Sequence, residues 1–89
     1  MNNTPVTVTG YVVALPSNID QRQSRVAIVQ DGVEHRVVPR GAGMDLVDDV
    51  SVQVEATGLL ENVEIDGQEV SYIHVRGYKV LDDDAWGDG

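Results

Sequence analysis

The sequence contains no cysteine, which excludes a disulfide framework, a thiolate zinc site and a cysteine nucleophile. Basic residues are scarce too, with six Lys and Arg against fifteen Asp and Glu. No apolar run approaches the ~20 residues of a membrane-spanning helix. The opening Met-Asn-Asn-Thr-Pro has neither the basic region nor the apolar core of an export signal. We therefore expect one small cytoplasmic domain, which is what 89 residues usually form.

The charge is unevenly distributed along the chain. Residues 1–40 hold three acids and four arginines, a net charge of +1, whereas residues 41–89 hold twelve acids and two bases, a net charge of −10. A negative field repels phosphate groups, and affinity for nucleic acid comes mostly from Lys and Arg on phosphates. This distribution favours a basic protein partner over general nucleic-acid binding.

The first forty residues hold a segment of alternating apolar and polar residues and two runs of β-branched residues, which are patterns of β-strands. The segment "PVTVTGYVVAL" predicts a long first strand, which Gly10 interrupts as at a bulge or a sharp coil. The segment "RVAIVQDGVEHRVVP" predicts a hairpin, because its Asp31-Gly32 pair is the strongest short turn signal.

The most regular alternation follows in "VSVQVEATG". Its apolar members are expected to face the core, and they are Val50, Val52, Val54 and Ala56. Gly58 predicts a kink, beyond which "LLENVEI" can prolong the strand. This segment is therefore predicted to be the fourth strand.

Asp66-Gly67 predicts a turn into a fifth strand, "EVSYIHVRGYKVL". Alternation places Ile73 and Val75 on its inner side and Tyr72, His74 and Arg76 on its outer side. Between the third and fourth strands, Met44 to Asp49 predicts one short helical turn or 3₁₀ segment.

The predicted fold class is all-β, a five-stranded closed or partly open Greek-key barrel. An open sheet of this size has to close or fold over to bury its apolar face. Long strands with an internal glycine suit closure, because such a strand can serve both halves of a small barrel. The barrel is expected to take up residues 1–81, followed by an acidic, disordered tail over 82–89.

The order of three strands, a short helix and two strands resembles the oligonucleotide/oligosaccharide-binding fold, or OB-fold, over roughly Val6 to Leu81. The opening "VTVTGYV" looks like an OB first strand, and "VSVQVEATGLL" with "IHVRGYKVL" looks like its closing pair. A small SH3-like barrel is the main alternative, although its strands tend to be shorter.

Residues for catalysis are sparse. His35 and His74 lie within predicted strands without a nearby nucleophile, so each is expected to be a strand-face histidine. Gly41-Ala42-Gly43 lacks the spacing and the lysine of a phosphate-binding loop. The sequence therefore predicts a binding module that is not an enzyme and has no cofactor or metal.

Four arginines form the candidate ligand-binding set: Arg22, Arg25, Arg36 and Arg40. The OB resemblance implies a site on the second and third strands, between the first loop and the last hairpin. Those strands contain no aromatic residue for stacking bases, and the last hairpin, "ENVEIDGQE", is acidic. Weak single-stranded nucleic-acid binding is therefore the alternative to the interaction with a basic protein.

The tail "LDDDAWGDG" offers a second candidate site, formed by Asp82, Asp83, Asp84 and Trp86. The aspartates look similar to the acidic tail tip of bacterial single-stranded-DNA-binding proteins, which implies docking in a basic groove with Trp86 as the anchor. The alternatives are a solvated terminus and a Trp86 that folds back on the barrel. In the OB-fold haem chaperone a histidine follows the last strand; none does here, which argues against haem.

Overall fold

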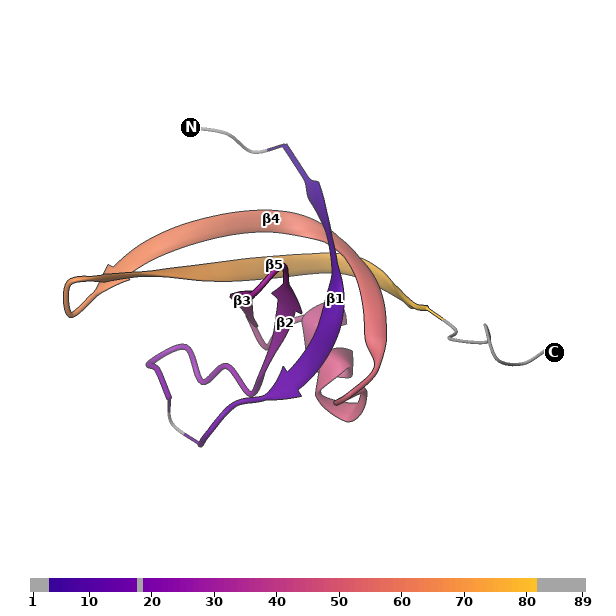
Figure 1. The fold of residues 1–89 in the computed structure, drawn as a ribbon, viewed down its shortest axis with the longest axis horizontal. Coiled ribbons are helices and arrows are strands. Elements are labelled where there is room, and N and C mark those ends of the chain that lie inside the picture. The colour runs from indigo at the N-terminus through magenta and orange to yellow at the C-terminus, as the bar shows by residue number, and fades with distance from the viewer. Residues whose placement is uncertain (1–3, 18, 82–89) are drawn as a thin grey trace, which may run out of the picture.

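The computed structural model describes residues 4–17 and 19–81, which form a closed barrel with the strand order β1-β2-β3-β5-β4 (Figure 1). Its elements are β1 (Val6–Ala14), β2 (Val26–Gln30), β3 (Val33–Val37), α1 (Ala42–Asp45), the 3₁₀ helix η1 (Leu46–Asp48), β4 (Gln53–Ile65) and β5 (Gln68–Val80). The predicted all-β class, the five-stranded closed barrel and the single short helical piece between the third and fourth strands are confirmed.

The barrel closes because β1 is shared between two neighbours. Its residues Val6 to Tyr11 pair with β4, and Tyr11 to Ala14 pair with β2. At Gly10 an added Cβ would overlap the carbonyl oxygen of Val29, so only glycine permits this approach of the two backbones. Gly10 thus lies where the strand changes partners, which agrees with the predicted interruption of a long first strand at this glycine.

The fourth strand bends in the same way. A register shift lies between Thr57 and Gly58, and a Cβ on Gly58 would overlap the carbonyl oxygen of His74. Beyond this irregularity β4 and β5 continue as a long antiparallel hairpin, which Figure 1 shows reaching past the rest of the barrel. The predicted kink at Gly58 and the continuation of the strand are both confirmed.

Two-residue turns close both hairpins. Asp31 and Gly32 have φ values of 52° and 81°, and Asp66 and Gly67 have 52° and 82°. Positive φ at both positions is the type I′ geometry, whose twist matches that of the flanking strands. Both Asp-Gly turn predictions are confirmed.

The core consists of aliphatic side chains from all five strands and from η1: Val8, Val12, Val26, Ile28, Val37, Leu46, Val54, Ala56, Ile73 and Val75. The predicted burial of Val50 is wrong, since its side chain is 40% exposed, and Val52 is only half-buried. Both precede β4 and belong to a turn in which Ser51 has φ 74° and the Val52 amide donates to the Asp49 carbonyl at 3.2 Å. The alternation holds from Gln53 onward.

Within residues 4–17 and 19–81, the helical content is limited to α1 and η1. Across the part of the chain that the structure describes, no helix has the length and hydrophobicity needed to span a membrane. The helical segment instead contributes Leu46 to the barrel core.

Replacing Gly10 with alanine is expected to lower the free energy of unfolding by about 2 kcal/mol, because the new methyl group overlaps the Val29 backbone. Gly77 is the matched control, since no atom lies within 4 Å of its added Cβ. Gly77→Ala should be neutral or raise the free energy of unfolding by about 0.5 kcal/mol. Urea unfolding of both variants measures the difference; equal stabilities would contradict the closure mechanism.

Candidate functional site

The first loop, defined here as residues 19–25, folds over the outer faces of β3 and β5 and is held there by Asp20. Arg36 and Tyr72 are register partners on that outer face. The Asp20 carboxylate accepts hydrogen bonds from Arg36 Nη1 at 3.0 Å, the Tyr72 hydroxyl at 2.9 Å and the Ser24 backbone amide at 3.1 Å. Its side chain is only 3% exposed, so one buried carboxylate joins the loop to two strands.

These donors keep Asp20 ionised. Burial by itself raises the pKa of a carboxyl group, but hydrogen bonds from Ser24, Tyr72 and Arg36 outweigh it and leave the pKa of Asp20 below 3.8. The pKa of the Tyr72 phenol is raised, first by burial and then by the hydrogen bond to Asp20. Near neutral pH the Asp20 carboxyl group is therefore ionised and accepts hydrogen bonds, and the Tyr72 hydroxyl keeps its proton and donates one.

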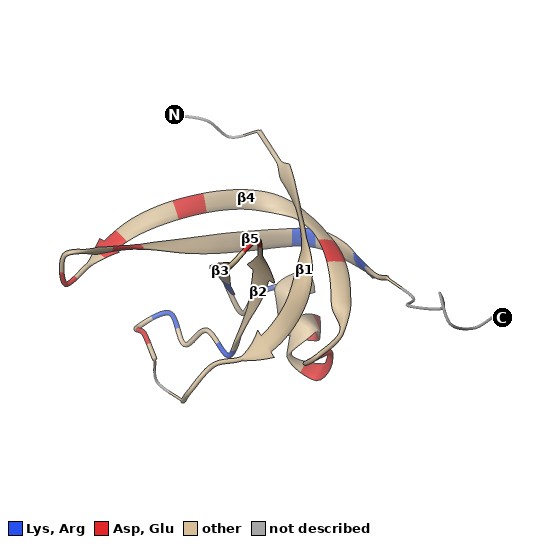
Figure 2. Cartoon of the chain, viewed as in Figure 1, with Lys and Arg blue, Asp and Glu red and all other residues tan. Residues whose placement is uncertain are grey.

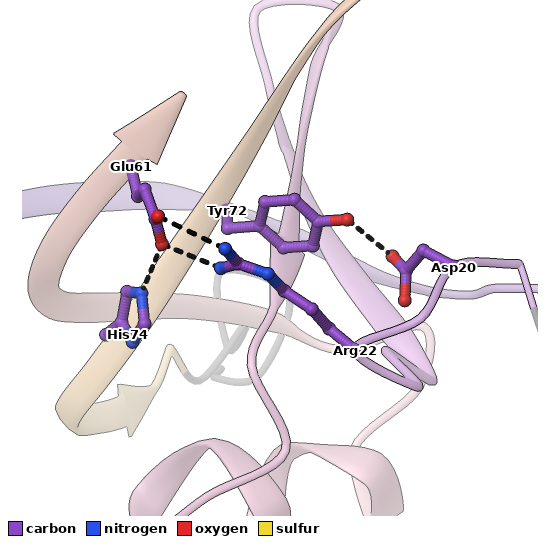
Figure 3. Close-up of polar contacts among 5 residues, drawn as sticks. All are labelled: Asp20, Arg22, Glu61, Tyr72 and His74. Atoms are coloured by element: carbon purple, nitrogen blue, oxygen red, sulfur yellow. Dashed lines mark hydrogen bonds and ion pairs between the residues drawn. The ribbon is translucent and has the colours of Figure 1, made fainter. Parts of the chain in front are cut away.

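Arg22 forms a second attachment across the outer face (Figure 3). Its guanidinium lies 4.4 Å from the centroid of the Tyr72 ring and donates to both oxygens of Glu61, at 2.7 and 3.1 Å. His74 Nε2 lies 2.9 Å from Glu61 Oε1. Because a carboxylate only accepts hydrogen bonds, that nitrogen carries a proton.

The hydrogen bonds from Arg22 and then from His74 lower the pKa of Glu61 to about 2. The side chains of Arg22 and Glu61 are nonetheless 34% and 42% exposed, so water screens their attraction. Asp20 is thus the firm attachment of the first loop, and the Arg22–Glu61 pair is the weaker one.

The four predicted arginines do not form a single cationic surface. Arg22 and Arg36 are each paired with a carboxylate, whereas Arg25 and Arg40 are exposed and form no ion pair with any described residue. Arg22 and Arg40 line one hollow on the outer face, while Arg25 and Arg36 each line a different one. Arg22 and Arg36 nevertheless lie close together, since Arg22 covers the Tyr72 ring and Arg36 donates to the Asp20 carboxylate that accepts from Tyr72. Arg25 lines a hollow that holds none of the other three.

The tyrosines are equally dispersed. Tyr72 lies on the outer side of its strand, as predicted, but it is buried beneath Arg22 because the first loop covers it. Tyr78 donates a hydrogen bond to Asp49 at 2.9 Å, and burial followed by that bond raises the pKa of Tyr78 to about 12. Only Tyr11, on β1, is well exposed. No aromatic platform lies on β2 or β3, as the sequence predicted.

The predicted tail site, Asp82, Asp83, Asp84 and Trp86, lies outside the described residues, and its role stays a prediction. Among residues 4–17 and 19–81, no three His, Asp or Glu side chains are grouped so that they could hold a metal ion.

The sequence did not predict a groove between the β2–β3 and β4–β5 hairpins. Its volume is about 720 Å³, and its lining residues are Gly32, Val33, Glu34, His35, Arg36, Leu60, Asn62, Gln68, Glu69, Val70 and Ser71. At its floor His35 Nδ1 lies 2.7 Å from the Ser71 hydroxyl, and burial lowers the pKa of His35, which is neutral at pH 7. The sequence did show acidic residues flanking both Asp-Gly turns. It could not show that these two hairpins lie side by side, because that depends on the parallel pairing of β3 with β5.

No family model matches this chain, and no curated protein matches it at a significant level. A function therefore has to be inferred from geometry and charge.

Replacing Asp20 with asparagine is expected to lower the free energy of unfolding by about 2 kcal/mol at pH 7, because Arg36 and Tyr72 lose a charged acceptor. The folded-state pKa of Asp20 is below the unfolded value near 3.8, so its contribution is complete above that value and disappears as pH falls through the folded pKa. Urea unfolding as a function of pH should therefore show wild type and Asp20→Asn converging in acid.

Asp31→Asn is the matched control, since Asp31 is exposed, forms no ion pair with described residues and has a positive φ that asparagine tolerates. Its effect should stay within about 0.5 kcal/mol at every pH. A difference for Asp20→Asn that persists undiminished in acid would show that its charge does not anchor the loop.

Proposed function

We propose that this chain is a small non-enzymatic binding module, built as an OB-like barrel, which recognises a basic protein partner. The OB assignment is supported by the strand order β1-β2-β3-β5-β4, by the parallel β3–β5 pair and by the helical segment between β3 and β4. An SH3-like barrel, the alternative, is less consistent with strands of 13 residues in β4 and β5.

The observation that carries the proposal is which charged side chains have no ion-pair partner among the described residues. Three of the six bases are already paired with carboxylates, through Arg22, Arg36 and Lys79. The acids at the two hairpin ends are exposed and form no ion pair with any described residue; they are Asp31, Glu34, Glu64, Asp66 and Glu69. Figure 2 shows the acidic end of the β4–β5 hairpin projecting from the barrel. Such a surface attracts a basic protein and repels a phosphate backbone.

Single-stranded nucleic acid remains the second proposal, and one observation favours it. Arg25 and Arg40 are exposed and unpaired among the described residues, so they can meet phosphates. Two observations weaken this proposal. Arg22 and Arg36 are paired with carboxylates of the chain itself, and Arg22 covers the Tyr72 ring on which a base would stack. Two phosphate contacts without base stacking support only weak, salt-sensitive binding.

One pair of titrations separates the two functions. We expect the full chain to bind a fluorescent peptide of alternating lysine and valine at physiological salt, and to bind neither the matching glutamate–valine peptide nor a labelled oligothymidine. Fluorescence anisotropy at low and physiological salt measures all three. Tight oligothymidine binding that Arg25→Ala with Arg40→Ala weakens by about tenfold would instead establish the nucleic-acid function.

A further inference from the structure

The β4–β5 hairpin leaves part of one strand edge outside the barrel ladder. The parallel pairing of β3 with β5 begins at His35 with Ser71 and ends at Val37 with Ile73. Residues 68–70 of β5 pair with β4 alone, and Val33 and Glu34 of β3 pair with β2 alone. Their other edges face a groove without partners in that ladder. An edge of this kind can hydrogen-bond an added strand.

The groove between these edges has room for a chain segment and offers it apolar contacts. Its volume of about 720 Å³ falls within the range of ligand sites. Val33 and Leu60 line it and are 50% and 40% exposed, so two large aliphatic residues of the groove are in contact with water. Burying them against a partner would remove apolar surface from water.

The charge of the groove selects a cationic occupant. Glu34 and Glu69 line it, and the one lining base, Arg36, is already held by Asp20. Glu64 and Glu69 are direct cross-strand partners, a like-charge pairing that destabilises a hairpin until a cation approaches. Because the described residues contain no cluster of three metal-binding groups, a basic side chain fits this charge better than a metal ion.

We propose that an extended basic segment of the partner protein binds in this groove. Its backbone pairs with the free edge of β5 at residues 68–70. Because alternate residues of a strand point to opposite faces, Glu69 and Leu60 lie on one face of the hairpin, and there the Lys or Arg side chains of the segment meet Glu69 with their charged ends and cover Leu60 with their aliphatic stems. Glu34 lines the same groove and adds to its negative potential. The inference rests on the proposed function and adds the site and the binding mode. A second copy of this chain fits less well, because it would bring the same acidic hairpins to the groove.

The charge part of the proposal is tested with matched neutral variants. Glu34→Gln with Glu69→Gln removes two carboxylates from the groove, and Asp45→Asn with Asp48→Asn removes two exposed carboxylates from the helical segment. We expect the first pair to weaken binding of the lysine–valine peptide about tenfold at physiological salt, and the second to leave it nearly unchanged, since salt screens distant charges. Leu60→Ser should weaken binding as well, while circular dichroism verifies folding.

The strand-pairing part is tested with the peptide itself. N-methylation of every second residue removes the amide donors on one side of an extended chain, and shifting the frame by one removes those on the other side. Pairing along β5 predicts that one frame abolishes binding. Equal binding of both methylated peptides would overturn the pairing.

The remaining outcomes separate this inference from the proposed function. If the helical-segment variants weaken binding as much as the groove variants, the groove is not the site, although the basic-partner function stands. If the unmodified peptide does not bind at all, both fail. A dimer that elutes from size-exclusion and dissociates in Glu34→Gln with Glu69→Gln would assign the groove to a second copy and overturn the proposal.

Discussion

The barrel depends on two close approaches between backbones, of β1 to β2 at Gly10 and of β4 to β5 at Gly58. At each site a side chain would overlap a carbonyl oxygen, so the strands can bend sharply only where glycine stands. These bends let β1 pair with both β2 and β4 and close the sheet. β4 and β5 are longer than the other strands, so that their hairpin extends past the barrel and forms one wall of the groove.

The first loop decides which charges stay available. Asp20 is buried and accepts three hydrogen bonds, so it fixes the loop over β3 and β5. Its ion pair with Arg36 neutralises that arginine within the barrel. Arg22 covers the Tyr72 ring and pairs with Glu61 at the surface. The outer face of β3 and β5 thereby loses the cations and the aromatic ring that would suit a nucleotide, while the hairpin acids keep their full charge.

Local signals in the sequence were sufficient for the strands, the turns and the closure. The Asp-Gly pairs tolerate positive φ and predicted both hairpin turns, and Gly10 within a long predicted strand indicated the irregularity at which β1 changes partners. The alternation misled at Val50, because the turn at Ser51 delays the start of β4 and no hydropathy pattern reveals a positive φ at a serine.

The site was harder to predict because it depends on contacts between distant segments. Tyr72 and Asp20 are 52 residues apart, and so the covering of that tyrosine could not be read from its own strand. The groove requires the parallel register of β3 with β5, which neither strand encodes alone. Pairing of the arginines with acids was one of the possibilities that the sequence left open, but the identity of the partners, Glu61 for Arg22 and Asp20 for Arg36, could not be predicted.

The most direct test of the central claim is a map of backbone amide shifts on the isotope-labelled full chain, titrated first with the lysine–valine peptide and then with oligothymidine. We predict that the peptide shifts amides at residues 33–35 and 68–71, and that the oligonucleotide leaves these signals in place. Peptide-induced shifts confined to the helical segment, or oligonucleotide-induced shifts across the groove, would contradict the account.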